Sequence, residues 1–164
     1  MEEPLPAGGS CLLGSFNLST YVKGKVFQTV DFIKDIKIVV RAMNKVLDEG
    51  LPLHPLKIQQ DTVRDYRQIG IGLMGIADML IKLGIRYGSS LSLKICDGIG
   101  FVLANTALKE SALLANKYSP YPKYNREAVL SSEFIKNNTT IDTYELIKKY
   151  GLRNSQILTI APFK

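Results

Sequence analysis

The stretch from residue 67 to residue 80, RQIGIGLMGIADML, constrains the fold of this chain more than any other part of the sequence. In its first half, branched residues alternate with glycine: Ile69, Gly70, Ile71, Gly72 and Leu73. A strand with this pattern carries branched side chains on one face and almost nothing on the other, so another part of the protein must approach the bare face. After Gly75 the apolar residues change to helical spacing, which predicts a helix over 76–83. A strand, a tight turn and a helix form the half-unit of an α/β layer.

Patterns elsewhere in the chain add strands and helices on both sides of this unit. A short strand is predicted around Cys11, Leu12 and Leu13, and a buried strand over 154–162. Apolar spacing and capping residues predict the other helices, over 29–49, 55–68, 89–117 and 142–150. Their expected first residues or caps are Pro55, Ser89 and Asp142, and Gly50, Gly84 and Gly151 are expected to end helices. A segment rich in Tyr, Pro and Asn, 118–140, is predicted to be an extended loop.

The connections between the predicted strands are long enough for parallel pairing. The fold class is therefore α/β, in a single domain over residues 1–164. Because the first and last predicted strands lie at the two ends of the chain, little is left to cover a sheet or close a barrel. This arrangement suggests a piece of a larger structure.

Composition excludes several classes of function. The net charge is +6, but the 21 Lys and Arg residues are scattered, which favours a solvated surface over a nucleic-acid interface. No segment reaches the roughly 18 apolar residues of a membrane-spanning helix, and the acidic start is unlike a signal peptide, so we expect a cytoplasmic protein. Two cysteines and one histidine are too few for a disulfide framework or a zinc site.

Some local patterns allow more than one interpretation. Residues 70–75 fit G-x-G-x-x-G, so a nicotinamide-binding module is one alternative, but the charged segment before them and the helical position of Asp97 favour close strand packing. His54 is most simply a surface loop residue, and Cys96 a small buried hydrophobe. The tyrosines of the 118–140 segment are expected to pack over a helix end.

Four blocks of sequence, taken together, resemble one known family. They are Glu2-Glu3-Pro4-Leu5, Cys11 to Leu18, Arg67 to Asp78 and Asn154 to Pro162. In this order they are similar to the large, catalytic subunit of class I and class II ribonucleotide reductases. The resemblance implies part of a ten-stranded α/β barrel of parallel strands with helical crossovers.

The resemblance also implies an activity and two site residues. The family replaces the 2′-hydroxyl of a ribonucleotide by hydrogen through radical chemistry. By the Glu-x-Pro-Leu motif, Glu2 matches the glutamate that acts as general base on the 3′-hydroxyl. Cys11 matches the downstream member of the redox pair that supplies reducing equivalents and ends as a disulfide. On its own chemistry, without the resemblance, Cys11 would be interpreted as an inert thiol.

Departures from the family pattern lead us to expect a fragment that is inactive by itself. The radical cysteine would lie two residues before Glu2, and the family's Thr-Gly-Ser phosphate loop would follow Pro162, where Phe163 and Lys164 stand instead. An alternative is a non-catalytic truncated or split-gene assembly module. Such a module would self-associate or pair with the missing segments.

Partners and cofactors follow from the same resemblance. We expect a ribonucleotide substrate in the parent enzyme, the missing barrel segments as partners, and a possible homodimer through exposed sheet edges, with no nucleic-acid or membrane partner. No cofactor is expected on this segment. The parent enzyme would use either adenosylcobalamin or a separate metal-containing radical subunit, and its preference for diphosphates or triphosphates is left open.

Overall fold

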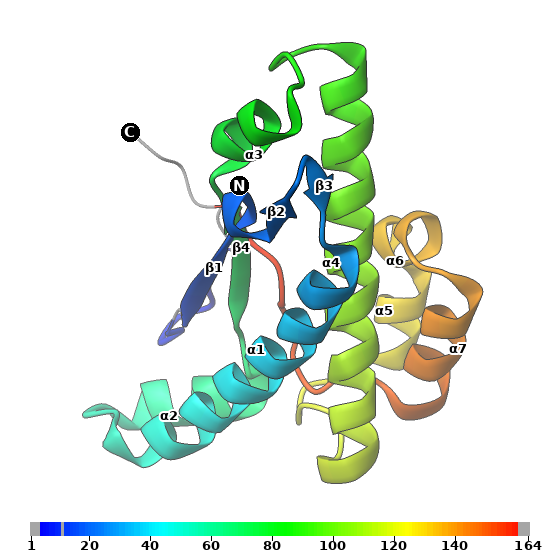
Figure 1. Cartoon of the computed structure of the whole chain (residues 1–164). Coiled ribbons are helices and arrows are strands. Elements are labelled where there is room, and N and C mark those ends of the chain that lie inside the picture. The colour runs from blue at the N-terminus through cyan, green and yellow to red at the C-terminus, as the bar shows by residue number, and fades with distance from the viewer. Residues whose placement is uncertain (1–3, 11, 161–164) are drawn as a thin grey trace.

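The computed structural model describes residues 4–10 and 12–160, and Figure 1 shows how their helices and strands are arranged. A short parallel sheet lies at the centre. Strand β1 (Leu13–Asn17) pairs in parallel with strand β4 (Gly70–Met74), with Leu13 opposite Gly70 and Asn17 opposite Met74. On the other edge of β4, Ile71 forms a parallel bridge with Leu158. Three segments that lie far apart in the sequence therefore run side by side, as expected for parallel pairing.

Helices connect these three segments. α1 (Thr29–Gly50) and α2 (Lys57–Tyr66) lie between β1 and β4, and α3 (Ile76–Leu83) follows β4 directly. The longest helix, α4 (Ser90–Tyr118), comes next, followed by α5 (Arg126–Ser131), α6 (Glu133–Asn138) and α7 (Ile141–Tyr150). Short 3-10 helices at Leu18–Tyr21 (η1) and Leu51–Leu53 (η2), and a small hairpin of β2 (Val22–Lys23) and β3 (Val26–Phe27), complete the order.

Residue chemistry explains where several helices begin and end. Ser89 caps α4 as expected, because its hydroxyl accepts a hydrogen bond from the Ser92 amide at 3.2 Å. Gly84 ends α3 in the left-handed conformation, with φ of +72°. Gly151 ends α7 in the same positive-φ half of backbone space, with φ of +75°.

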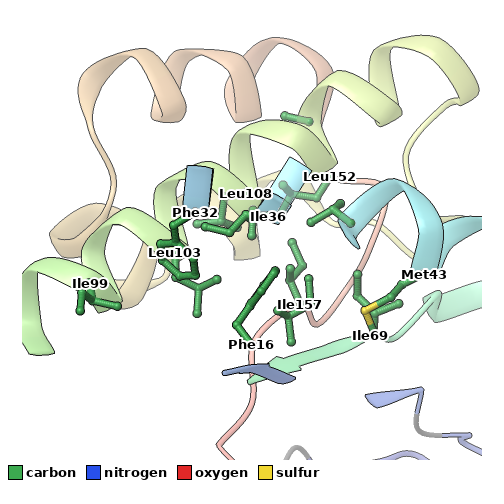
Figure 2. Packing of buried hydrophobic residues seen from close by; sticks show 14 of the residues in the cluster. Phe16, Phe32, Ile36, Met43, Ile69, Ile99, Leu103, Leu108, Leu152 and Ile157 are labelled. Carbon is green, nitrogen blue, oxygen red and sulfur yellow. The ribbon is translucent and has the colours of Figure 1, made fainter. Parts of the chain in front are cut away.

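The hydrophobic core lies on one face of the sheet. Ile69 and Ile71 are fully buried there, and Phe16 of β1 joins them. α1 contributes Phe32 and Ile36, neither of which has any exposed surface, and α4 packs against α1 (Figure 2). The branched residues of the glycine stretch thus face the helical layer, as their alternation predicts.

The bare face of β4 is approached by its neighbours in the sheet. A Cβ atom added to Gly70 would lie 2.5 Å from Cδ2 of Leu13 and 2.7 Å from Cγ2 of Thr159. A Cβ atom on Gly72 would lie 3.0 Å from the Thr159 carbonyl oxygen and 3.1 Å from the Ser15 hydroxyl. Close packing inside the strand, and not a dinucleotide turn, therefore accounts for these glycines.

Some predicted elements differ from the structure. The segment predicted as an extended loop, 118–140, contains the short helices α5 and α6. α7 is capped by Thr140 and not by Asp142, because the Thr140 hydroxyl accepts from the Thr143 amide at 3.3 Å. α2 begins at Lys57, two residues after Pro55.

The barrel prediction is met only in part. Within the described residues, the 154–162 strand forms a single bridge at Leu158, and the parallel sheet does not close into a barrel. The parallel pairing with helical connections supports the α/β class.

α4 is the one helix of the described residues that is long and apolar enough, by length and composition, to cross a membrane. This differs from the expectation that no segment would qualify. The central helix of a folded domain meets the same criteria, and α4 packs between α1 and α7 with Glu110 and Ser111 buried.

Candidate active site on the open face of the parallel sheet

The two faces of the parallel sheet differ in how they are covered. α1 and α4 lie over the face that carries Phe16 and Ile69 (Figure 2). The opposite face carries Leu13, Ser15 and Met74, which are all exposed, with Leu13 retaining 51% of its surface and Met74 43%. This second face, which we call the open face, also carries Gly70 and Gly72. It is a largely apolar surface, on which the side chains of Leu13 and Thr159 fill the space beside Gly70.

The carboxyl ends of β1 and β4 are locked together by a tight turn. Gly75 adopts φ of +69°, and a Cβ atom there would overlap Oδ1 of Asn17. That oxygen accepts hydrogen bonds from the Ser19 amide at 3.2 Å and the Ser19 hydroxyl at 2.9 Å. Lys82 of α3 donates to the Ser19 carbonyl oxygen at 2.8 Å. Glycine is therefore required at this position, both for its backbone conformation and for its lack of a side chain.

Contacts with distant segments hold the N-terminal segment. Gln156 donates from Nε2 to the Pro4 carbonyl oxygen at 3.1 Å, and Thr62 of α2 donates to the Ala7 carbonyl oxygen at 3.0 Å. The amides of Gln68 and Gln156 also form a hydrogen bond with each other. The segment that follows Glu2 in sequence is thus held beside the N-terminal ends of β4 and of the segment that contains Leu158.

The two site residues taken from the family resemblance, Glu2 and Cys11, lie outside the described residues. Their described neighbours are placed. Ser10 and Leu12, on either side of Cys11, line a cavity of about 340 Å³ together with His54. His54 is half-buried and not a simple surface residue, and its carbonyl oxygen accepts from Gln60 at 2.9 Å. Sequence reasoning had no signal for this proximity, because it depends on how the α1–α2 connection folds back toward β1.

The other residues singled out in the sequence have structural roles. Cys96 is half-buried in α4 with a free thiol. Tyr121 and Tyr124 form an edge-to-face pair with ring centroids 5.4 Å apart, and the Tyr124 ring packs against Gly151 at the end of α7, as expected. Tyr118, in contrast, keeps 54% of its surface exposed. In the parts of the chain that the structure describes, no group of three His, Cys, Asp or Glu side chains is placed to hold a metal.

An apolar cavity of about 580 Å³ borders the third segment of the sheet. Its walls include Pro4, Tyr121, Phe134, Gln156 and Leu158. The Ser155 hydroxyl, which also lines it, is buried without a hydrogen-bond partner. This cavity adjoins both the anchored N-terminal segment and the outer edge of the sheet.

A comparison with protein families gives a match over the whole chain. Residues 1–164 match the family described as ribonucleotide reductase, barrel domain. The chain belongs to the ribonucleotide reductase family. Membership in this barrel-domain family accounts for the parallel strands, for the helical connections and for the face of β4 that carries only glycine at positions 70 and 72.

Curated relatives agree with this membership. The ribonucleoside-diphosphate reductase subunit alpha of Chlamydia pneumoniae is 28% identical over 93% of this chain, and the ribonucleoside-diphosphate reductase large chain of Cryptosporidium parvum is 30% identical over 93%. The vitamin B12-dependent ribonucleoside-diphosphate reductase of Thermoplasma acidophilum is 35% identical over 98%.

The chain spans 16% to 20% of the length of these three relatives. One of these three relatives is named as vitamin B12-dependent, and the other two are not.

Proposed function

We propose that this chain forms part of a ribonucleotide reductase catalytic barrel and takes part in the radical-based reduction of ribonucleotides to deoxyribonucleotides. The observation that carries the proposal is the sheet itself: β1, β4 and the Leu158 segment run parallel, helices cover one face, and the other face is bare at Gly70 and Gly72. In a closed barrel the uncovered face would line the interior. Substrate would bind there.

Cys11 is proposed as the reducing thiol on this face. It stands two residues before Leu13, and side chains two apart along a strand share a face. Leu13 and Ser15 both belong to the open face. We infer the open face for Cys11 from this spacing alone, because Cys11 lies outside the described residues.

Glu2 is proposed as the acid–base group that exchanges a proton with the 3′-hydroxyl. The Gln156–Pro4 hydrogen bond supports this role, because it anchors the backbone two residues after Glu2. A general base has to be held within hydrogen-bond distance of the proton that it removes.

The missing barrel segments are the proposed partners. In the described residues the parallel sheet has β1 at one edge and the single bridge at Leu158 at the other. An unpaired strand edge is a template for a further strand. We therefore expect the 164-residue chain to be inactive by itself, and to gain activity when the remaining barrel segments are added.

The test is reconstitution of ribonucleotide reduction from this chain and complementary segments of a related reductase, with reductant and radical source supplied. The wild-type chain should restore product formation, and Cys11→Ser and Glu2→Gln should abolish it. Cys96→Ser is the matched control, because it removes the other thiol without touching the open face. Full activity of the Cys11→Ser mixture, or turnover by the chain alone, would refute the proposal.

Several finer points belong to the same proposal. The radical initiator, adenosylcobalamin or a separate metal-containing subunit, is expected to be held by other parts of the enzyme, and the described residues offer no group of three His, Cys, Asp or Glu side chains for a metal. Comparing ribonucleoside diphosphates with triphosphates in the reconstituted assay would identify the substrate. A cytoplasmic location is expected for an enzyme of deoxyribonucleotide synthesis.

A second candidate is a non-catalytic assembly module that self-associates. The exposed Leu13 and Met74 side chains on the open face favour it, because an apolar face tends to bind another surface. A stable homodimer that ignores added barrel segments would support this second candidate over the first.

A further inference from the structure

A polar cleft lies away from the open face, between the C-terminal halves of α1 and α4 and the turn that follows α7. Its volume is about 430 Å³. Within the described residues its lining includes more cationic than anionic side chains: Arg41, Lys45, Arg67, Lys117 and Arg153, against Asp48 and Glu110. The cleft is therefore positively charged overall.

Both carboxylates of this cleft are already paired. Glu110, whose side chain is only 4% exposed, accepts from Nε of Arg41 at 2.6 Å. Asp48 accepts from Nη1 of Arg67 at 2.6 Å. The two acidic groups are thus committed to the first two arginines.

One buried amide, Asn44, lines the cleft, and Asn154 holds it from behind. Asn154 has no exposed surface, and its side chain exchanges two hydrogen bonds with Asn44, at 3.0 and 3.1 Å. Asn44 also accepts from Nη2 of Arg67 at 3.1 Å. The Arg67 guanidinium is 93% buried and is held by Asp48 on one side and Asn44 on the other. Its position is therefore fixed.

Lys45 pairs with Glu49 at 3.3 Å. Among the described residues that line the cleft, this leaves two cations without a carboxylate partner, Lys117 and Arg153. Arg153 donates from Nη1 to the carbonyl oxygens of Tyr118 and Ser119, both at 3.0 Å, and both acceptors are neutral. Burial, and next the charge of Arg67, lower the pKa of Arg153, while the charge of Asp48 acts in the opposite direction. Lys117 lies with Nζ 4.8 Å from the centre of the Tyr118 ring.

We propose that this cleft binds a phosphate group, held by Arg153 and Lys117. A dianion matches two cations that have no carboxylate partner, and guanidinium and ammonium groups commonly bind phosphate oxygens in proteins. The volume leaves room for the remainder of a small phosphorylated molecule beside Leu113 and Leu114. This site does not depend on the reductase activity, and its residues are distant in sequence from Glu2 and Cys11.

The experiment is calorimetric titration of the protein with inorganic phosphate at constant ionic strength, with acetate as the comparison anion. The structure predicts saturable phosphate binding, weaker binding of acetate, and about tenfold weaker phosphate binding after Lys117→Gln, as expected when one charge-assisted contact is lost. Arg153→Gln should weaken binding at least as much. Since Arg153 also contacts the end of α4, the exposed Lys117 keeps the test independent of folding.

Lys149→Gln is the matched control. Lys149, like Lys117, stands in the last turn of a helix with its Nζ over the next residue's ring, at 5.0 Å from Tyr150, but it lies outside the cleft. Its replacement should leave phosphate binding unchanged. Absence of saturable binding, equal binding of acetate, or equal losses in Lys117→Gln and Lys149→Gln would each overturn the proposal.

Discussion

At the scale of single residues, Asn154 joins three distant parts of the chain through hydrogen bonds. No pattern in the sequence indicates this role. Its amide contacts Asn44 of α1, the Arg67 carbonyl oxygen at 2.9 Å and the Ser111 hydroxyl of α4 at 3.0 Å. The site is fully buried, so each of these partners would lose its hydrogen bond without gaining water.

Replacing Asn154 by Ala should therefore lower the free energy of unfolding by about 2–4 kcal/mol. Asn116→Ala is the control, because Asn116 is exposed on α4, and its change should stay within about 0.5 kcal/mol. Urea denaturation followed by circular dichroism measures both. Equal effects of the two substitutions would show that the buried network contributes no stability.

Tyr21 makes the stability of the fold depend on pH in the alkaline range. Burial, and then its hydrogen bond to Asp35 at 2.8 Å, raise the pKa of the Tyr21 phenol well above its usual value. A group whose folded pKa is raised stabilises the fold below its unfolded pKa and loses that contribution as the pH rises beyond it.

Stability should thus fall from pH about 10 upward as the Tyr21 proton is lost more readily from the unfolded chain. In Tyr21→Phe this decline should be shallower, because no proton is then lost at position 21. Melting temperatures measured from pH 8 to 11 test the expectation. Parallel curves for the two proteins would contradict it.

At the scale of elements, one glycine of β4 and one of α4 distinguish two reasons for having glycine in regular structure: close packing and backbone freedom. A methyl group at Gly70 would lie within 2.7 Å of two neighbouring side chains, whereas Gly98 of α4 has nothing within 4 Å of the corresponding position. Both glycines stand inside regular secondary structure. They form a matched pair.

Gly70→Ala should destabilise the protein by about 1–3 kcal/mol because Leu13 and Thr159 must move apart. Gly98→Ala should stabilise it by about 0.5–1 kcal/mol, since alanine is the better helix former. Thermal or urea denaturation gives both signs. Stabilisation by Gly70→Ala would mean that the neighbours accommodate a side chain freely.

α4 shows why helix position was easier to predict than its buried face. Its start at Ser89 and its length followed from capping and spacing, but two of its large apolar residues, Leu91 and Leu113, are 54% and 40% exposed. The buried face instead contains small residues, including Ala107, Ser111, Ala112 and Ala115. Small side chains let α1 and α7 approach closely, and a pattern based on large apolar residues misses them.

Other limits of prediction have similarly local causes. The helices α5 and α6 have only six residues each, so their apolar spacing is too short to distinguish from a loop. Of the strand expected over 154–162, the described part, up to residue 160, forms one bridge, because apolar composition does not specify how long pairing continues. The central strand and its parallel neighbours were predictable, since alternation and connection length constrain them strongly.

At the scale of the whole molecule, the open face is the least protected surface of the sheet. Leu13 remains half-exposed on it. In the absence of other barrel segments, this apolar surface beside an unpaired strand edge should promote self-association.

Leu13→Lys should therefore shift the protein toward monomer in sedimentation velocity at high concentration. Val30→Lys is the control, because Val30 is 80% exposed but belongs to α1 and not to the sheet. If both substitutions, or neither, change the association state, the open face is not the contact surface.

The positively charged cleft could not be foreseen from the sequence. Its residues come from α1, the end of α2, α4 and the turn after α7, and each stands among ordinary surface charges in the chain. Only the fold brings Arg67, Lys117 and Arg153 to one place. The assignments of Glu2 and Cys11, in contrast, come from the family motifs alone and stay predictions.

The position of β4 between two partners has a consequence for synthesis on the ribosome. β1 and β4 can pair early, but the Ile71 amide reaches the Ile157 carbonyl oxygen only after all of the later helices have been made. Until then the nascent chain carries an unpaired edge at its centre, which is a target for chaperones and for wrong pairings. The slowest step of maturation should thus be the arrival of the last segment, and not the formation of the long helices.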